Sequence, residues 1–262
     1  MHAHLFEFED LESYPRIFRE ATTLYLETVE RIFGADRLFA PKLASLLVRT
    51  GARRLVDLGS GAGGPVRRAV REVEKSLHEP IDVTLTDLRP NQRAVERVER
   101  LGEGGLRYLR ESVDGSNPPP GLPGVRSMFA FFHHLRPEHA RAVLRRAYED
   151  REGICIFEIT GPSFLGILSC VLMPIYVLLL TPFVRPLTFW QVLFTYVIPL
   201  LPLLIAWDGF VSTLRTYSPK ELERMTATLR SDDYDWEIGT IRHPWLRVSL
   251  PYALGVPLAG TE

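Results

Sequence analysis

The sequence predicts an α/β fold with a doubly wound, mostly parallel sheet, an antiparallel final strand and an apolar helical insertion between the fifth strand and the last helix. Three observations predict it. Short apolar runs alternate with helix-spaced patterns from residue 54 to residue 158, which is typical of strands joined by crossover helices. A glycine-rich turn joins the first run directly to a helical pattern. Residues 161–207 carry a single charged side chain, Arg185, whereas the flanking segments have ordinary polarity.

The composition is that of an ordinary globular protein. Of 262 residues, 46% are apolar and 24% are charged, which suits one large α/β domain or a domain with an insertion. The 31 basic and 32 acidic side chains nearly cancel, which argues against nucleic acid as a partner. Cys155 and Cys170 lie in apolar runs, and their spacing is not that of a metal site. We therefore expect no metal, no disulfide framework and a reducing compartment.

The elements of the sheet and its helices follow one another in order up to residue 158. Two helices are expected before the first strand, over residues 15–33 and 36–51, the second ending at Gly51. Apolar strands are expected at residues 54–58, 81–85, 106–109, 127–132 and 154–158. The helices between them cover residues 65–77, 91–101 and 137–148.

Ordinary polarity returns after residue 207, and the pattern there predicts one helix and two strands. The helix covers residues 218–229, with Ser218 as its N-cap and Glu221 as the acid of a capping box. Residues 236–241 and 245–250 are expected to form an antiparallel pair around His243. These elements would complete the sheet.

The strongest local signal is the run Asp57-Leu58-Gly59-Ser60-Gly61-Ala62-Gly63, which joins the first strand to a helix. Glycines allow positive φ and close backbone approach to a ligand, and the new helix offers free N–H groups. A tight strand–helix turn needs glycine for structural reasons as well. Two further acids, Asp87 and Asp114, follow the second and third strands. A carboxylate in the position of Asp87 can accept both ribose hydroxyl protons of a nucleoside.

These motifs resemble those of the class I S-adenosylmethionine (SAM)-dependent methyltransferases, which have a Rossmann-like fold. The resemblance covers residues 52–160 and 217–253, and includes the stretch Phe132-His133-His134-Leu135-Arg136-Pro137 after the fourth strand. It implies SAM as the cofactor, with the glycine run around its methionine part, Asp87 on the ribose and Asp114 near the adenine. The cofactor-binding residues are then expected to be Asp57, Gly59, Ser60, Gly61, Gly63, Asp87 and Asp114.

The sequence departs from the pattern of that family at the fourth strand, which begins Val125-Arg126-Ser127 where the family usually has an acid. A nicotinamide-dependent Rossmann enzyme is the alternative, because Gly59, Gly61 and Gly64 satisfy the G-x-G-x-x-G spacing. Against it stand Asp57 inside the strand, Asp114 after the third strand, and a proline directly after Gly64.

Two uncharged runs, residues 163–181 and 187–207, have the length of membrane spans. Pro174, Pro199 and Pro202 would each kink a spanning helix. Both ends of the block join one sheet, so the segment must cross twice, as a hairpin turning at residues 182–186, or not cross at all. We expect contact with a membrane on its cytoplasmic face, with a hairpin that spans the bilayer or dips into one leaflet. The alternative is a soluble cytoplasmic protein whose block is a packed lid or the interface of a homodimer.

Several polar side chains are candidates for chemistry near the strand ends. His133 or His134 could act as a base, and Glu158 at the end of the fifth strand could face the same crevice; structural hydrogen bonds are the alternative for each. A cap over the site, or ordinary packing, is expected of residues 6–14. Candidates for substrate binding at the exit of the apolar block are Asp208, Arg215 and Tyr217, which could instead mark the return of the chain to water.

Four segments are therefore expected: an N-terminal helical cap (1–51), a cofactor-binding core (52–160), an apolar insertion that faces a membrane or forms a lid (161–216), and C-terminal elements that complete the core (217–262). The predicted function is transfer of the methyl group of SAM to a hydrophobic, membrane-soluble small molecule. The alternatives are a membrane-associated protein that binds SAM without catalysis, and a soluble dimeric methyltransferase.

Overall fold

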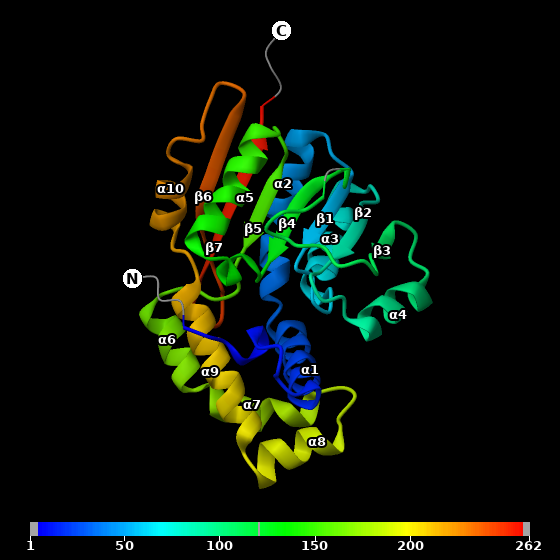
Figure 1. The fold of residues 1–262 in the computed structure, drawn as a ribbon, viewed down its shortest axis with the longest axis vertical. Helices are drawn as coiled ribbons and strands as arrows, with labels where there is room; N and C mark the ends of the chain where they lie inside the picture. Colours follow the sequence, from blue (N-terminus) through cyan, green and yellow to red (C-terminus); the bar gives the residue numbers. More distant parts are fainter. Residues whose placement is uncertain (1–4, 120, 259–262) are drawn as a thin grey trace.

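A seven-stranded mixed sheet forms the centre of the molecule (Figure 1). The computed structural model describes residues 5–119 and 121–258. The strand order is β3-β2-β1-β4-β5-β7-β6, in which β1 to β5 are parallel and β7 is antiparallel to both of its neighbours. The strands are β1 (Arg54–Leu58), β2 (Asp82–Thr86), β3 (Leu106–Tyr108), β4 (Val125–Phe129), β5 (Ile154–Phe157), β6 (Tyr234–Arg242) and β7 (Ser249–Pro257). The predicted doubly wound sheet with an antiparallel final strand is confirmed.

Helices cover both faces of this sheet because side chains alternate along its buried strands. On one face, Leu55, Val83 and Phe157 pack against α2 (Ala40–Thr50), α3 (Gly64–Leu77) and α4 (Gln92–Leu101). On the other, Val56 and Ile156 pack against α5 (Pro137–Glu149) and α10 (Pro219–Thr226). The capping box predicted for the last helix is present, between Ser218 and Glu221.

Two strand predictions were wrong in their bounds. The last strand begins at Ser249 and not at residue 245, and Trp245 is 77% exposed in the preceding turn. Because α2 covers one face of β7 and α5 and α10 cover the other, both faces are buried, and its sequence lacks the alternation that marks a half-exposed strand. The fourth strand ends at Phe129, before the positive φ (51°) of Ala130, and a short 3₁₀ turn η3 (Phe132–His134) follows.

The insertion forms a helical bundle beyond the C-terminal ends of the parallel strands, below the sheet in Figure 1. Its helices are α6 (Phe164–Val171), α7 (Met173–Leu180), α8 (Phe189–Val192), which continues as a π-helical turn η5 (Leu193–Val197), and α9 (Leu200–Arg215). The first helix, α1 (Arg16–Phe33), joins this bundle through Tyr25, which packs in one cluster with Val177 and Ile205. The expected N-terminal unit therefore divides, because α2 packs in the core of the sheet. Residues 1–4 and 259–262 of the predicted segments lie outside the described residues.

The prolines of the insertion lie at helix breaks or in first turns, where a missing N–H breaks no helical hydrogen bond. Pro174 is in the first turn of α7, Pro199 is the N-cap of α9 and Pro202 is in its first turn. Within the described residues, no single helix has the length and apolar character to cross a membrane. Two pairs of consecutive helices have the required length and apolar character when taken together, but each pair is bent. They are Phe164–Val171 with Met173–Phe183, bent by 55°, and Phe189–Val197 with Leu200–Arg215, bent by 86°.

Candidate active site

The glycine loop after β1 has a backbone that only glycine accommodates well. Gly59, Gly61 and Gly63 have φ values of 70°, 53° and 72°. A Cβ at Gly59 would lie 2.2 Å from the ring of Phe131, and one at Gly63 would lie 2.6 Å from Leu85. A Cβ at Gly61 would meet nothing within 4 Å. The loop is therefore closely packed at its two ends and open at its middle.

Asp87, at the end of β2, fixes this open middle. Its carboxylate accepts hydrogen bonds from the N–H groups of Gly61 and Arg89, both at 2.8 Å. Tyr108 donates its hydroxyl to the carbonyl of Gly61 at 2.8 Å. The backbone N–H of Val113 reaches the carbonyl of Asp87 at 2.9 Å, which brings the segment after β3 beside the loop. The segments that follow the first three strands thus lie side by side at the C-terminal ends of these strands, as the sequence predicts.

The other two predicted acids lie differently. Asp57 is 2% exposed beneath the loop, where its carboxylate accepts the hydroxyl of Ser127 at 2.7 Å. Burial raises the pKa of Asp57 to about 7. Its carbonyl accepts the hydroxyls of Ser60 and Thr86, so this residue shapes the loop from inside. Asp114 is exposed and accepts hydrogen bonds from Ser116. Direct contact of these acids with a cofactor stays a prediction.

A histidine–carboxylate pair lies after β4 and β5. Nδ1 of His133 is 2.7 Å from one carboxylate oxygen of Glu158, and the backbone N–H of His133 donates to the other at 2.9 Å. Both residues are buried. Because Glu158 holds the imidazole through Nδ1 and through the backbone, it leaves Nε2 as the nitrogen that can take a proton. The sequence named both residues as candidates, and the structure brings them into direct contact.

Residues 5–10, which we call the N-terminal strap, lie against α9 beside this pair. Asp208 accepts the backbone N–H groups of Phe8 and Glu9 at 2.8 and 3.3 Å. The indole of Trp207 donates to the carbonyl of Phe6 at 3.0 Å, and Nε of Arg215 donates to the carbonyl of Leu5 at 2.8 Å. The sequence predicts either a cap or ordinary packing for residues 6–14. The strap packs on α9, and a capping role stays a prediction.

Charged groups tie the strap to His134. Nδ1 of His134 lies 3.1 Å from the carboxylate of Asp10, and Arg215 pairs with both Asp10 (2.7 Å) and Glu7 (3.2 Å). Burial raises the pKa of Glu7. Burial would also raise the pKa of Asp10, but His134 and Arg215 outweigh it and hold that pKa below its usual range. His134 is thus part of the strap contact, separate in role from the His133–Glu158 pair.

The three predicted substrate residues have structural partners. Asp208 and Arg215 are buried and hold the strap. Tyr217 is 2% exposed, packs on Phe132 and donates its hydroxyl to the carbonyl of Leu135 at 2.8 Å. A substrate role for them stays a prediction.

Ligand atoms of Glu7, His133 and His134 lie within 4.8 Å of one another, a set of donors that could hold a metal ion. The guanidinium of Arg215 already lies 3.2 Å from Glu7, and Glu158 occupies Nδ1 of His133. The positive charge of Arg215 at the cluster opposes metal binding, whereas the contact with Glu158 leaves Nε2 of His133 available as a ligand atom. We therefore interpret the cluster as proton and hydrogen-bond chemistry, and the absence of a metal stays a prediction.

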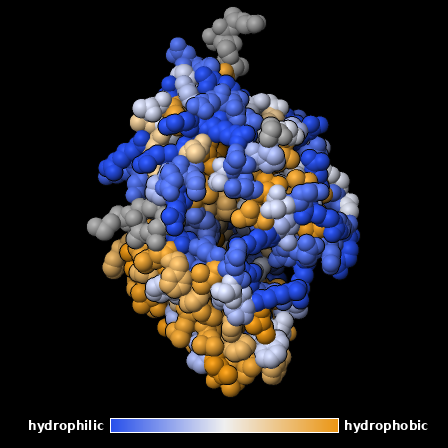
Figure 2. Space-filling model, in the orientation of Figure 1, coloured by the Kyte–Doolittle hydropathy of each residue, from blue (hydrophilic) through white to orange (hydrophobic). Residues whose placement is uncertain are grey.

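An apolar groove of about 660 Å³ runs between α6 and α9, with the strap forming one wall. This volume is in the range of small-molecule sites. Its lining is apolar throughout: Phe6, Phe8, Cys170, Val171, Pro174, Leu200, Leu203, Leu204, Ala206, Trp207 and Phe210. α9 also contacts η3, which carries His133. Phe6 and Phe8 line the groove on either side of Glu7 in the sequence, and Glu7 has a carboxylate oxygen within 4.8 Å of a ring nitrogen of His133, so the strap lies between the groove and the histidine–carboxylate pair. Figure 2 shows the apolar end of the molecule to which these helices belong.

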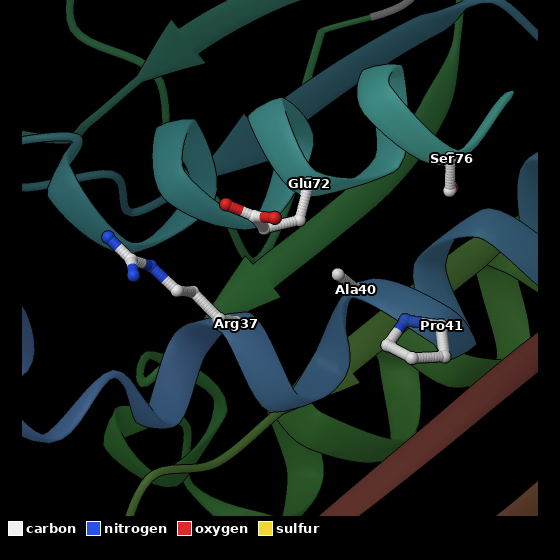
Figure 3. Close-up of a pocket in the computed structure, with 5 residues that line it drawn as sticks. All are labelled: Arg37, Ala40, Pro41, Glu72 and Ser76. Atoms are coloured by element: carbon white, nitrogen blue, oxygen red, sulfur yellow. The ribbon is translucent and has the colours of Figure 1, made fainter. Parts of the chain in front are cut away.

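A second cavity, of about 470 Å³, lies between α3 and the start of α2 (Figure 3). It is lined by Arg37, Ala40, Pro41, Glu72 and Ser76, side chains from two segments that pack on each other. None of them belongs to the glycine loop, the histidine–carboxylate pair or the strap. We assign no chemistry to this cavity.

The sheet, with its strand order and the glycine loop after β1, is the fold of solved methyltransferase structures. Among solved structures, the plantazolicin methyltransferase BpumL in complex with S-adenosylhomocysteine (SAH) is similar, with a TM-score of 0.56 and 13% identity over 95% of this chain and 92% of that one. Human N-acetylserotonin methyltransferase in complex with SAM has a TM-score of 0.50 and 15% identity, over 97% of this chain and 63% of that one. No protein-family model matches the sequence. No curated protein matches it either.

Sequence reasoning missed the partners that complete the site. Sequence reasoning placed Glu7 and Asp10 only in a cap, although they pair with Arg215 at the end of α9, far away in the sequence. Phe131, whose ring packs over Gly59 and Gly115, had no motif to mark it. Only the sequence Phe-His-His after the fourth strand, typical of the resembling family, indicated this region.

Proposed function

We propose that this chain is a SAM-dependent methyltransferase that methylates a hydroxyl group of a hydrophobic, membrane-soluble small molecule. Two solved structures that share its fold are methyltransferases bound to SAM or SAH. The glycine loop fits such a cofactor, because its middle is open above Gly61 while Asp87 lies beside it. When bound, SAM supplies a methyl group on a sulfonium sulfur.

The observation that carries the reaction type is the His133–Glu158 pair. An alcohol or phenol must lose its proton as it attacks a methyl carbon, whereas a neutral amine can attack first. Glu158 orients the imidazole and stabilises its protonated form, so that Nε2 of His133 can take the hydroxyl proton. Both members of the pair are buried, and Glu7 of the strap has a carboxylate oxygen within 4.8 Å of a ring nitrogen of His133. The pair therefore supports a hydroxyl acceptor.

The apolar groove supports a hydrophobic acceptor. Its walls bear no charged side chain, and its end at Phe6 and Phe8 borders Glu7, which reaches the histidines. An acceptor with an apolar chain can place that chain between α6 and α9. Its hydroxyl group would then lie at the end of the groove beside Glu7 and the histidines.

Calorimetry of SAM binding tests the cofactor assignment. Asp87→Ala removes the carboxylate beside Gly61, and we expect SAM affinity to fall at least tenfold. Asp82→Ala is the matched control, because Asp82 begins the same strand and its side chain is exposed at the opposite end of the sheet. Unchanged affinity in Asp87→Ala, or an equal loss in both variants, would refute the assignment.

Transfer of label from methyl-labelled SAM to a lipid extract tests the reaction. We expect His133→Ala to lose about two to four orders of magnitude in kcat with SAM affinity retained. Glu158→Gln should lower kcat less, because the amide oxygen can still accept one of the two hydrogen bonds from His133. Methyl transfer that does not depend on His133 would refute its role. SAM binding without label in any lipid fraction would favour the non-catalytic alternative.

A further inference from the structure

The insertion has an apolar cluster inside, but much of its outer surface is apolar as well. Three of its polar side chains point inward: Thr181, Gln191 and Thr195 are at most 1% exposed. Six of its large apolar side chains point outward, with exposed fractions from 61% to 80%: Phe164, Val171, Leu179, Phe189, Val197 and Leu203. In water this arrangement leaves unfavourable apolar surface on the outside. In lipid, polar residues characteristically face the interior of a helical bundle.

The exposed apolar residues come from every helix of the insertion rather than from one flat face. They include Leu165 and Leu168 on α6, Ile175 on α7, Trp190 on α8 and Leu200 on α9. Figure 2 shows apolar residues over the lower end of the face in view, where these helices lie. An interface between two copies of the chain would bury one patch, whereas a lipid leaflet covers such an end from all sides.

The turn between α7 and α8 limits how deep the bundle can lie. Arg31, near the end of α1, donates to the carbonyl of Phe183 at 3.0 Å. Arg185 donates to the carbonyls of Pro182 and Val184, both at 2.8 Å. Since α1 carries charged side chains and is tied to α3 by an ion pair between Glu30 and an arginine, this turn stays near the polar body of the molecule. It cannot be the far end of a hairpin that crosses a bilayer.

We propose that the apolar end formed by α6–α9 lies within one leaflet of an anionic lipid bilayer, with Arg31 and Arg185 at the level of the headgroups. Two arginines at that level would be attracted to anionic lipid. Val171, Leu200 and Leu203 belong both to this surface and to the lining of the groove. An acceptor could therefore pass from the leaflet into the groove without crossing water, a part of the proposal that rests on the proposed function.

The proposed placement of α6–α9 in a lipid leaflet is tested by flotation with phosphatidylcholine vesicles that contain phosphatidylglycerol as the minor, anionic component. The wild-type protein should float with these vesicles. Leu179→Asp and Val197→Asp each place a charge on the lipid side, and each should weaken binding at least tenfold. Val48→Asp is the matched control, because Val48 is 57% exposed on α2 at the polar end, and it should bind as the wild type does. Circular dichroism and SAM calorimetry show whether each variant is folded.

A second variant tests the charge at the border. Arg185→Gln should lower binding to these vesicles about fivefold and leave binding to pure phosphatidylcholine unchanged. The proposal fails if the wild type does not float, if Val48→Asp weakens binding as much as Val197→Asp, or if Arg185→Gln affects both vesicle types equally. It also fails if light scattering shows a lipid-free dimer that the aspartate variants dissociate, since the end would then be an interface.

Flotation and SAM calorimetry on the same samples separate this proposal from the proposed function. Vesicle binding without SAM binding would contradict the proposed function but support the placement of α6–α9 in a lipid leaflet. SAM binding without flotation would contradict only that placement.

Discussion

Gly59 and Gly61 lie two residues apart in one loop, yet a methyl group added at each meets different surroundings. At Gly59 it would overlap the ring of Phe131 and sit on a backbone with φ of 70°. We expect Gly59→Ala to lower the free energy of unfolding by about 3 kcal/mol. A methyl group at Gly61 would meet no neighbour. Gly61→Ala should therefore lower the free energy of unfolding by only about 1 kcal/mol, because alanine disfavours a φ of 53°.

Urea denaturation measures the two costs, and calorimetry measures SAM binding. Because the added methyl group at Gly61 points into open space above the loop, SAM affinity should fall at least tenfold in that variant despite its near-normal stability. Equal stability losses in both variants would contradict the packing described for Phe131. Normal SAM affinity in Gly61→Ala would contradict the position of the cofactor.

Asp57 should make stability depend on pH. Its pKa is about 7 in the folded protein and about 4 in the unfolded chain, so the folded state holds its proton more tightly. The stabilisation is complete below about pH 4 and is lost as pH rises through about 7, an effect of roughly 3 to 4 kcal/mol. Asp57→Asn stays neutral and can still accept from Ser127. Its stability relative to the wild type should therefore rise between pH 4 and pH 8 in urea titrations. A constant difference would show that Asp57 is ionised throughout.

At the scale of elements, the N-terminal strap depends on Arg215. The guanidinium is buried and pairs with Glu7, which is itself only 2% exposed. Arg215→Met leaves that carboxylate buried without its cation, which typically costs about 3 to 5 kcal/mol. We expect the strap to detach, detected as faster hydrogen exchange at residues 6–10.

Arg16→Met is the control for the strap. Arg16 pairs with Glu20 on the same helix and its side chain is 80% exposed, so its loss should cost at most about 1 kcal/mol. If exchange in the strap were the same in both variants, Arg215 would not be its anchor.

The sequence predicts elements well where the pattern is local. β1 is found at its predicted bounds, and Asn91 caps α4 as the expected start of that helix. The strand β7 was misplaced because burial on both faces removes its alternation. The glycine loop, Asp57 and Asp87 form a motif around one βαβ unit, so they could be recognised. The strap could not, because Phe8 and Asp208 meet from opposite ends of the chain and no pattern in either segment indicates the other.

At the scale of the whole molecule, two ligands should protect two different regions. The sheet and its covering helices share two apolar clusters, whereas α1 and the insertion share a third. We expect SAM to slow hydrogen exchange at residues 58–64 and 86–90, around Gly61 and Asp87, and to leave α7 and α8 unchanged.

Anionic vesicles should do the reverse, slowing exchange in α6–α9 and leaving the glycine loop unchanged, because the exposed apolar side chains lie on those helices. Adding both ligands should slow exchange in the strap more than either alone, since the strap contacts α9 on one side and η3 on the other. Val197→Asp is the control, and should lose the vesicle effect while keeping the SAM effect. If vesicles instead slowed exchange across α3 and α4, the lipid surface would lie on the wrong end of the molecule, and an acceptor could not reach the groove directly from the leaflet.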